Sequence, residues 1–203
     1  TALMAMSIDT MLPALGRMAT ELSATSKDDE ALIILMFFAG NMVGIPVFGP
    51  MSDSLGRKPS IFIGLAIYGV GSLLCAMAWS FPILLLGRVI QGFGVASPRI
   101  VVLAMVRDGA KGSAMAKIMS FVMSVFMLVP IIAPSIGQAV MLFASWHYIF
   151  YGLTVMALIA GVWVGRGQEE QLPVETRRPL SALACGGAAG EGTGEGSACR
   201  DAL

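Results

Sequence analysis

Three ionisable side chains lie within otherwise apolar stretches of the sequence, where they can do chemistry or bind a polar ligand: Asp9, Arg88 and Arg99. A charged group at the centre of a lipid-like environment costs at least about 2.5–3.5 kcal/mol, so such residues mark candidate functional sites. A carboxylate there can gain and lose a proton as its exposure to water changes. Each residue also has a simpler explanation. Asp9 can lie at an interface, and Arg88 and Arg99 can extend their long side chains to the nearest aqueous boundary.

The composition identifies the medium around these residues. Of 203 residues, 56% are hydrophobic and only 13% are charged, and the mean hydropathy is +0.80, whereas soluble domains have about 45–50% apolar and about 25% charged residues. With 13 basic and 13 acidic residues, the chain has no basic excess for binding nucleic acid. Three cysteines without a CxxC pair and a single histidine exclude a disulfide framework and a multi-histidine metal centre. We therefore expect an all-α polytopic membrane protein without a metal or other cofactor.

The apolar stretches predict the membrane spans. A spanning helix needs about 20 mostly apolar residues. Five stretches meet that length, namely Ala31–Met51, Ser60–Trp79, Pro82–Val106, Met115–Phe143 and Trp146–Val164. Residues 1–16 provide roughly 24 Å of helix against a hydrocarbon core of roughly 30 Å, so we expect a first span whose beginning is missing from the sequence. The short connections between spans, such as SDSLGRKP and RDGAKGSAMAK, are predicted to be loops and contain Asp53 and Asp108.

These spans divide the chain into three parts. Residues 1–165 are predicted to form a six-helix transmembrane bundle, and residues 166–181 a cytoplasmic linker. The tail at 182–203 has six Gly and six Ala among 22 residues, so we expect a disordered linker or a reading-frame artefact. Lys and Arg are distributed unequally between alternate connections: eight on one side (Arg57, Lys58, Arg107, Lys111, Lys117, Arg166, Arg177, Arg178) and two on the other (Arg17, Lys27). The positive-inside rule then places the N-terminus and the tail in the cytoplasm.

Three motifs at corresponding places in these spans resemble those of one transporter family. The first, GPMSDSLGRK, lies between the second and third spans and contains Gly49, Asp53, Gly56, Arg57 and Lys58. It resembles the signature loop of the major facilitator superfamily. Arg88-Val-Ile-Gln91-Gly92-Phe-Gly94 is similar to the fourth-helix motif of that family. Pro130-Ile-Ile-Ala-Pro134-Ser-Ile-Gly137 is similar to the fifth-helix motif associated with antiporters.

Further segments resemble one subgroup, the Bcr/CflA drug-resistance transporters. They are IDTMLPAL in the first span, MVRD with Asp108 after the fourth, SWHYIF at the start of the sixth, and LPVETRRPLS after it. The resemblance covers residues 1 to about 181. Because the superfamily has twelve spans in two halves, the resemblance implies that this chain supplies the N-terminal six-helix half and that the second half is missing.

The resemblance implies a role for each group of residues. Asp53 and Arg57, with Gly49, Gly56, Lys58 and Asp108, would form a latch between the cytoplasmic ends of helices, and Gly49 would let a partner helix approach. Asp9 would carry the coupled proton, because it is the only acid within a predicted span. Arg88 and Gln91 would support it through a hydrogen-bond network. A cationic or neutral apolar substrate would then compete with the proton near Asp9. Pro130, Pro134 and Gly137 would form the antiporter-type helix kink.

These expectations combine into one function. We expect a proton-coupled multidrug exporter that works by alternating access in the bacterial inner membrane, with drug-like molecules, protons and the lipid bilayer as its partners. An uptake carrier or uniporter of the same fold, and an inactive truncated or non-transporting membrane protein, are the alternatives. An enzyme is not expected, because no nucleophile–base pair is evident in the sequence.

Overall fold

The computed structural model describes residues 2–22, 27–109 and 113–167, and every regular element in these ranges is a helix. The first segment comprises α1 (Ala2–Asp9), the short 3-10 helix η1 (Leu12–Ala14) and α2 (Leu15–Glu21). Five long helices follow: α3 (Lys27–Leu55), α4 (Arg57–Ala76), α5 (Phe81–Gly109), α6 (Ser113–Phe143) and α7 (His147–Gly167). Most of the predicted linker and the whole Gly/Ala tail lie outside the described residues.

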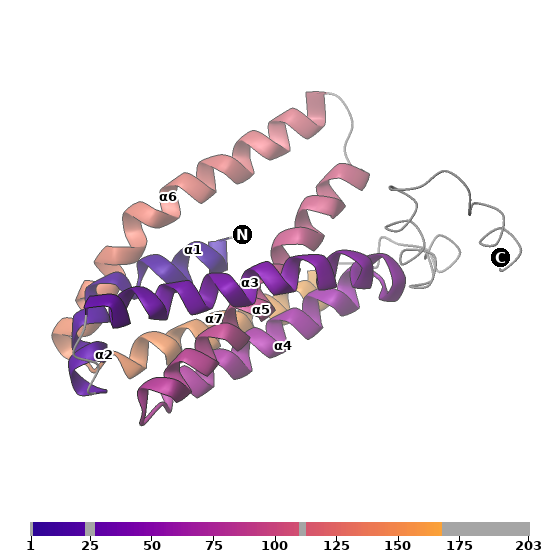
Figure 1. Ribbon diagram of the computed structural model, residues 1–203. Helices are drawn as coiled ribbons and strands as arrows, with labels where there is room; N and C mark the ends of the chain where they lie inside the picture. Colours follow the sequence, from indigo (N-terminus) through magenta and orange to yellow (C-terminus); the bar gives the residue numbers. More distant parts are fainter. Residues whose placement is uncertain (1, 23–26, 110–112, 168–203) are drawn as a thin grey trace, which may run out of the picture.

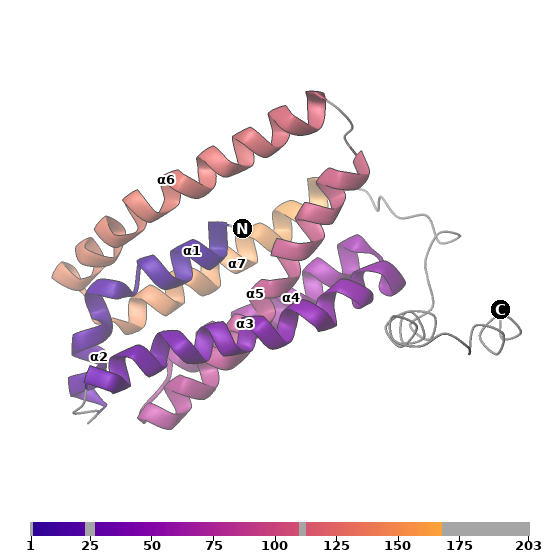
Figure 2. The same cartoon turned by 45° about the horizontal axis from the view of Figure 1, so that its top comes forward.

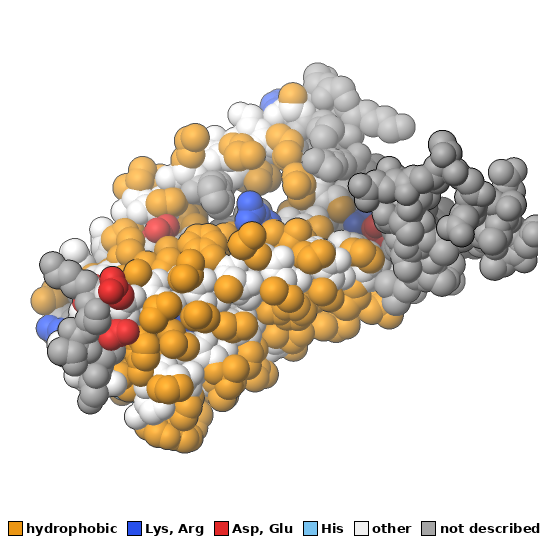
Figure 3. Space-filling view, in the orientation of Figure 1, with side chains coloured by type: hydrophobic (Ala, Val, Ile, Leu, Met, Phe, Trp, Pro, Cys, Tyr) orange, Lys and Arg blue, Asp and Glu red, His pale blue; other side chains and the backbone are white. Residues whose placement is uncertain are grey.

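The five predicted full spans are confirmed. Each of the five long helices is long and apolar enough to cross a membrane, and their ends differ from the predicted ends by at most four residues. Large apolar side chains such as Met42, Leu142 and Trp163 are exposed on the outside of the bundle. Figure 3 shows this apolar surface extending over the face formed by α3 and α4. An exposed apolar surface of this extent is typical of a protein surrounded by lipid.

The first segment is broken, although the sequence predicts one partial span there. Proline lacks an N–H, and its ring clashes with the carbonyl four residues earlier. Pro13 therefore disrupts the helix at Asp9, where α1 ends. The Met11 amide instead donates a hydrogen bond to the Ile8 carbonyl at 3.3 Å, only three residues back. The break leaves Asp9 at the end of a half-helix.

The predicted loop between the second and third spans is wrong. Helix α3 continues to Leu55 and α4 begins at Arg57, so Gly56 alone separates them. Gly56 has φ 108° and ψ 160°, a conformation that is essentially restricted to glycine. Asp108 likewise lies within α5, which extends to Gly109, and not in a loop. The side chain of Asp108 lies outside the described residues.

Helix α5 organises the packing of the bundle. It packs along both α3 and α4, and α7 packs on α4. Figures 1 and 2 show α6 along one edge, with α1 between α6 and α7. This arrangement leaves much of α6 exposed, while the side of α5 toward α3 and α4 is buried.

Glycines permit the close contact between α3 and α5. A Cβ atom at Gly40 would overlap the Val89 carbonyl oxygen, and one at Gly92 would overlap the Phe37 carbonyl oxygen. Both neighbours are backbone atoms, so neither can move aside alone. Small residues commonly serve such close packing between membrane helices.

Candidate functional site

Arg88 is completely buried within the bundle and lies at the centre of a polar cluster. Its Nη1 donates a hydrogen bond to the Gln91 side-chain oxygen at 2.6 Å, and both terminal nitrogens approach the Ser7 carbonyl oxygen at 3.4–3.5 Å. Its Nη2 lies 2.6 Å from the Met11 sulfur. The guanidinium thus joins α5 to the two sides of the break in the first segment.

Aromatic rings and hydroxyl groups complete the surroundings of Arg88. Its guanidinium carbon lies 5.0 Å from the centroid of the Phe37 ring and 5.6 Å from that of Phe150, which is within range of a cation–π attraction. The Gln91 amide nitrogen donates to Ser72 Oγ at 2.8 Å. No carboxylate within the described residues pairs with Arg88. Polar groups and aromatic ring faces therefore stabilise the charge of its guanidinium.

Two further members of this cluster were not identified from the sequence. The Ser7 hydroxyl and the Tyr68 hydroxyl are 2.6 Å apart, and both residues are completely buried. A serine and a tyrosine in apolar stretches are common, so the sequence carries no distinctive signal for them. Their contact connects α1 to α4 across a separation of 61 residues.

Asp9 is two residues from the Ser7 carbonyl but does not join the Arg88 cluster. Its exposure is intermediate, and it makes no ion pair with Arg88 or with any other described residue. From the sequence we expect Arg88 and Gln91 to support Asp9. The structure brings Arg88 and Gln91 together and connects Arg88 to the carbonyl of Ser7, two residues before Asp9. Asp9 therefore lies at the break in the first segment without a counter-charge in the described part of the chain.

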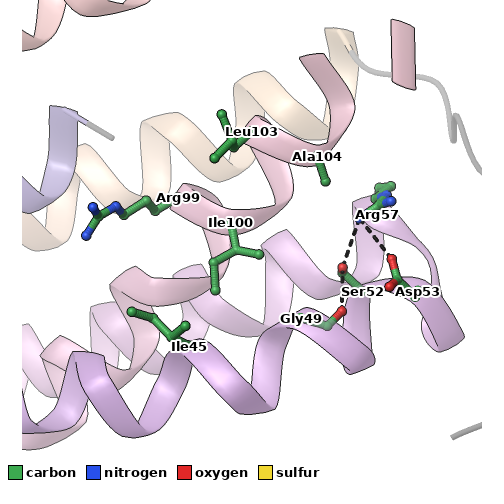
Figure 4. Close-up of a pocket in the computed structure, with 9 residues that line it drawn as sticks. All are labelled: Ile45, Gly49, Ser52, Asp53, Arg57, Arg99, Ile100, Leu103 and Ala104. Atoms are coloured by element: carbon green, nitrogen blue, oxygen red, sulfur yellow. Dashed lines mark hydrogen bonds and ion pairs between the residues drawn. The ribbon is translucent and has the colours of Figure 1, made fainter. Parts of the chain in front are cut away.

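The predicted latch residues are gathered at the junction of α3 and α4. Arg57 Nη1 lies 3.1 Å from Asp53 Oδ1 and donates a hydrogen bond to Ser52 Oγ at 3.1 Å (Figure 4). Ser52 in turn donates to the Gly49 carbonyl at 2.9 Å. Arg57 is buried, whereas the Asp53 side chain is 41% exposed. Asp53 lies in the last turn of α3, three residues before Gly56.

Lys58, the remaining basic residue of the motif, connects a different pair of helices. Its Nζ donates a hydrogen bond to the Gly165 carbonyl oxygen at 3.0 Å, in the last turns of α7. A cation at a helix C-terminus interacts favourably with the exposed carbonyl groups there. Lys58 therefore fastens α4 to α7 within this bundle.

An open pocket of about 440 Å³ extends from the latch residues along α3 and α5. Its lining includes Gly49, Asp53 and Arg57 at one end and Arg99 at the other (Figure 4). No described atom lies within 4 Å of the position that a Cβ would take at Gly49. The close approach of a helix expected at Gly49 is thus not made by any helix that the structure describes.

The fifth-helix motif lies in α6, which is helical through both Pro130 and Pro134. Gly137 faces the break in the first segment: a Cβ there would overlap the Thr10 carbonyl oxygen and touch the Pro13 ring. The motif glycine therefore lets α6 approach the backbone next to Asp9.

A second connection that the sequence did not reveal lies at the other end of the bundle. The Trp146 indole nitrogen donates a hydrogen bond to Glu21 Oε2 at 2.5 Å, and Arg17 donates to the Met141 carbonyl at 3.3 Å. Both charged residues come from α2. They hold this half of the first segment at the corner where α6 ends and α7 begins.

Comparison with known proteins agrees with the arrangement of helices and motifs. The family model described as Major Facilitator Superfamily matches residues 1–189, most of the chain.

The chain belongs to the major facilitator superfamily.

Members of this superfamily are multi-pass membrane transport proteins and not enzymes. An uncharacterized MFS-type transporter of Bacillus subtilis, YdgK, is 31% identical over 87% of this chain and 44% of its own length. The multidrug resistance protein MdtL of Klebsiella pneumoniae is 34% identical over 76% of this chain and 39% of its own length. The chain thus spans less than half the length of these curated relatives.

A solved structure confirms the superfamily fold. The crystal structure of the human organic anion transporter MFSD10 (TETRAN) superposes with a TM-score of 0.66 and 20% identity, covering 88% of this chain and 47% of the other. At this identity the likeness concerns the fold alone.

Proposed function

We propose that this chain is the N-terminal six-helix half of a drug:proton antiporter, which exports small drug-like molecules by alternating access between two six-helix bundles. The similarity to MdtL, a multidrug resistance protein, supports export of such molecules. The unequal distribution of Lys and Arg supports a cytoplasmic N-terminus. The bacterial sources of the curated relatives support the bacterial inner membrane.

The observation that carries the proposal is the environment of Asp9. It ends α1 at the break in the first segment, and it has no ion pair among the described residues. A carboxylate in an apolar bundle without a counter-charge gains a proton when it is shielded and releases it when water reaches it. Coupling follows when substrate binding and protonation at Asp9 exclude one another.

The Arg88 cluster gives Asp9 a fixed position in this proposal. Arg88 binds the carbonyl of Ser7, and Gly137 allows α6 to contact the carbonyl of Thr10. The backbone on the two sides of Asp9 is therefore in contact with α5 and α6. A rearrangement of α5 or α6 would change the exposure of the carboxylate.

The proposed latch lies at the end of the pocket that Gly49, Asp53 and Arg57 line. Arg57 is buried and bonded to both Asp53 and Ser52, while the surface beside Gly49 is open. A helix of the second bundle would fit beside Gly49 in one of the two end states and leave it in the other. Pro130 and Pro134 support such motion, because each lacks an amide donor and weakens α6 locally.

Drug export from bacterial cells tests this proposal. Cells that produce this chain together with a second six-helix half should export a fluorescent drug such as ethidium, and a protonophore should abolish the export. Cells that produce the 203-residue chain alone should not, because the transport path lies between two bundles. Export by the chain alone would contradict the half-transporter proposal. Drug accumulation driven inward by the two halves would favour an uptake carrier.

A further inference from the structure

A second polar cluster lies on the same helix as Arg88 but has a different environment. Arg99 Nη1 approaches the sulfur of Met4 at 3.4 Å, and the Asn41 side-chain nitrogen approaches the same sulfur at 3.6 Å. The three residues come from α5, α1 and α3. Helices α5 and α3 thus each direct one hydrogen-bond donor to a sulfur atom of α1 within the apolar part of the bundle.

The acceptor at this place is a poor match for the donors. A thioether sulfur accepts hydrogen bonds weakly, whereas a guanidinium has five N–H donors and binds carboxylate or phosphate groups best. Within the described residues Arg99 has no carboxylate partner. Asn41 is only 3% exposed, and its side-chain oxygen has no hydrogen-bond partner in the described part of the chain. That oxygen can only accept a hydrogen bond, so the two donors, and not this oxygen, are the groups that an additional acceptor would satisfy.

The direction of Arg99 excludes the simpler explanation from the sequence. A snorkelling arginine would extend toward the nearer, cytoplasmic end of α5, where Asp53 and Arg57 lie. Figure 4 shows the Arg99 side chain extending away from Asp53 and Arg57, and its contact is with α1. Arg99 is therefore directed toward α1 and away from the cytoplasmic end of α5, although its side chain stays exposed.

Within this cluster Arg99 lies where a molecule can reach it, whereas Asn41 is buried and is not among the residues that line the pocket. Arg99 is exposed and forms one end of the 440 Å³ pocket, whose apolar lining includes Ile45, Ile100 and Leu103. A ligand here would meet a fixed positive charge beside an apolar wall.

We propose that Arg99 and Asn41 form a substrate subsite that binds the anionic group of an amphipathic organic molecule, with its apolar part against the pocket wall. The group is a carboxylate, sulfonate or phosphate, which accepts from the guanidinium of Arg99 and the amide of Asn41. This inference rests on the proposed function, because it places the subsite in the transport path. It extends the expected substrates from cationic and neutral molecules to amphipathic anions and zwitterions.

Two dyes that differ by one sulfonate test the subsite. The 203-residue chain in nanodiscs of zwitterionic lipid is titrated with 8-anilinonaphthalene-1-sulfonate and with N-phenyl-1-naphthylamine, its uncharged counterpart, and empty nanodiscs supply the background. Arg99→Gln should weaken sulfonate binding by about tenfold or more, because a charged hydrogen-bond donor is lost, and leave binding of the uncharged dye unchanged. Asn41→Leu should weaken sulfonate binding severalfold, and Arg99→Lys should retain part of it.

Arg166→Gln is the matched control, because it removes the same charge from an exposed position in the last turn of α7. Its sulfonate binding should equal that of the unmodified chain. Unchanged sulfonate binding by Arg99→Gln, or equal loss of both dyes, would overturn the inference, whatever the export assay shows. Sulfonate binding that depends on Arg99, combined with no proton-driven export, would contradict the proposed function and leave the subsite supported.

Discussion

At the scale of single residues, the two arginines of α5 show what the sequence can and cannot reveal. Both stand out as charges in an apolar stretch, so both are predictable as candidates. Their surroundings are not predictable, because the partners come from distant parts of the chain. Arg88 meets a carbonyl 81 residues away and is completely buried, whereas Arg99 meets a thioether 95 residues away and stays accessible.

Removal of the Arg88 side chain should destabilise the bundle. In Arg88→Ala the Gln91 oxygen and the Ser7 carbonyl lose their donor, and a cavity remains between two aromatic rings. We expect the free energy of unfolding to fall by about 1–3 kcal/mol. Thermal unfolding in detergent measures this, with Arg166→Ala as an exposed control. Equal unfolding temperatures for the two variants would show that the cluster contributes nothing to stability.

Asp53→Asn should separate function from stability. Asp53 is partly exposed, so its ion pair with Arg57 contributes at most about 1 kcal/mol. We therefore expect normal amounts of folded protein and a severalfold or greater loss of drug export by the two-bundle transporter. Glu30→Gln, in the first turn of the same helix, is the control and should export normally. Normal export by Asp53→Asn would remove Asp53 from the latch.

At the scale of the elements, the five long helices were predictable because bilayer thickness fixes a minimum length of apolar sequence. The ends of these helices were less predictable. Hydropathy falls at SDSLGRKP, yet the chain stays helical up to and after Gly56, because that glycine alone makes the turn. The break in the first segment carried a sequence signal in Pro13, but length alone favoured one continuous span. The sequence carried no signal for which helices contact one another.

The glycine contacts between α3 and α5 give a prediction at this scale. Gly92→Ala places a methyl group against the Phe37 carbonyl, and Gly40→Ala places one against the Val89 carbonyl, so the helices must move apart. We expect each to lower the free energy of unfolding by about 1–3 kcal/mol. Gly69→Ala in α4 faces open space and should be neutral or stabilising by up to about 1 kcal/mol. Equal stability of all three variants would refute the close α3–α5 contact.

At the scale of the whole molecule, the charge asymmetry predicts the orientation in the membrane. In a chain whose Cys75, Cys185 and Cys199 are replaced, Ser26→Cys should react with an impermeant maleimide in intact cells. Ser54→Cys should react only after the membrane is permeabilised, because it lies in the last turn of α3 beside the basic residues of α4. The reverse pattern of labelling would invert the proposed topology.

The role of Asp9 connects all three scales, since one carboxylate at a helix break is proposed to couple two bundles to a proton gradient. Asp9→Asn is nearly isosteric and cannot titrate, and Asn also caps helices well. The most direct measurement is drug transport against an imposed pH gradient in proteoliposomes that contain this chain with a second six-helix half. The account predicts that Asp9→Asn still binds the drug but no longer responds to the gradient. Gradient-driven export by Asp9→Asn at the rate of the unmodified transporter would contradict it.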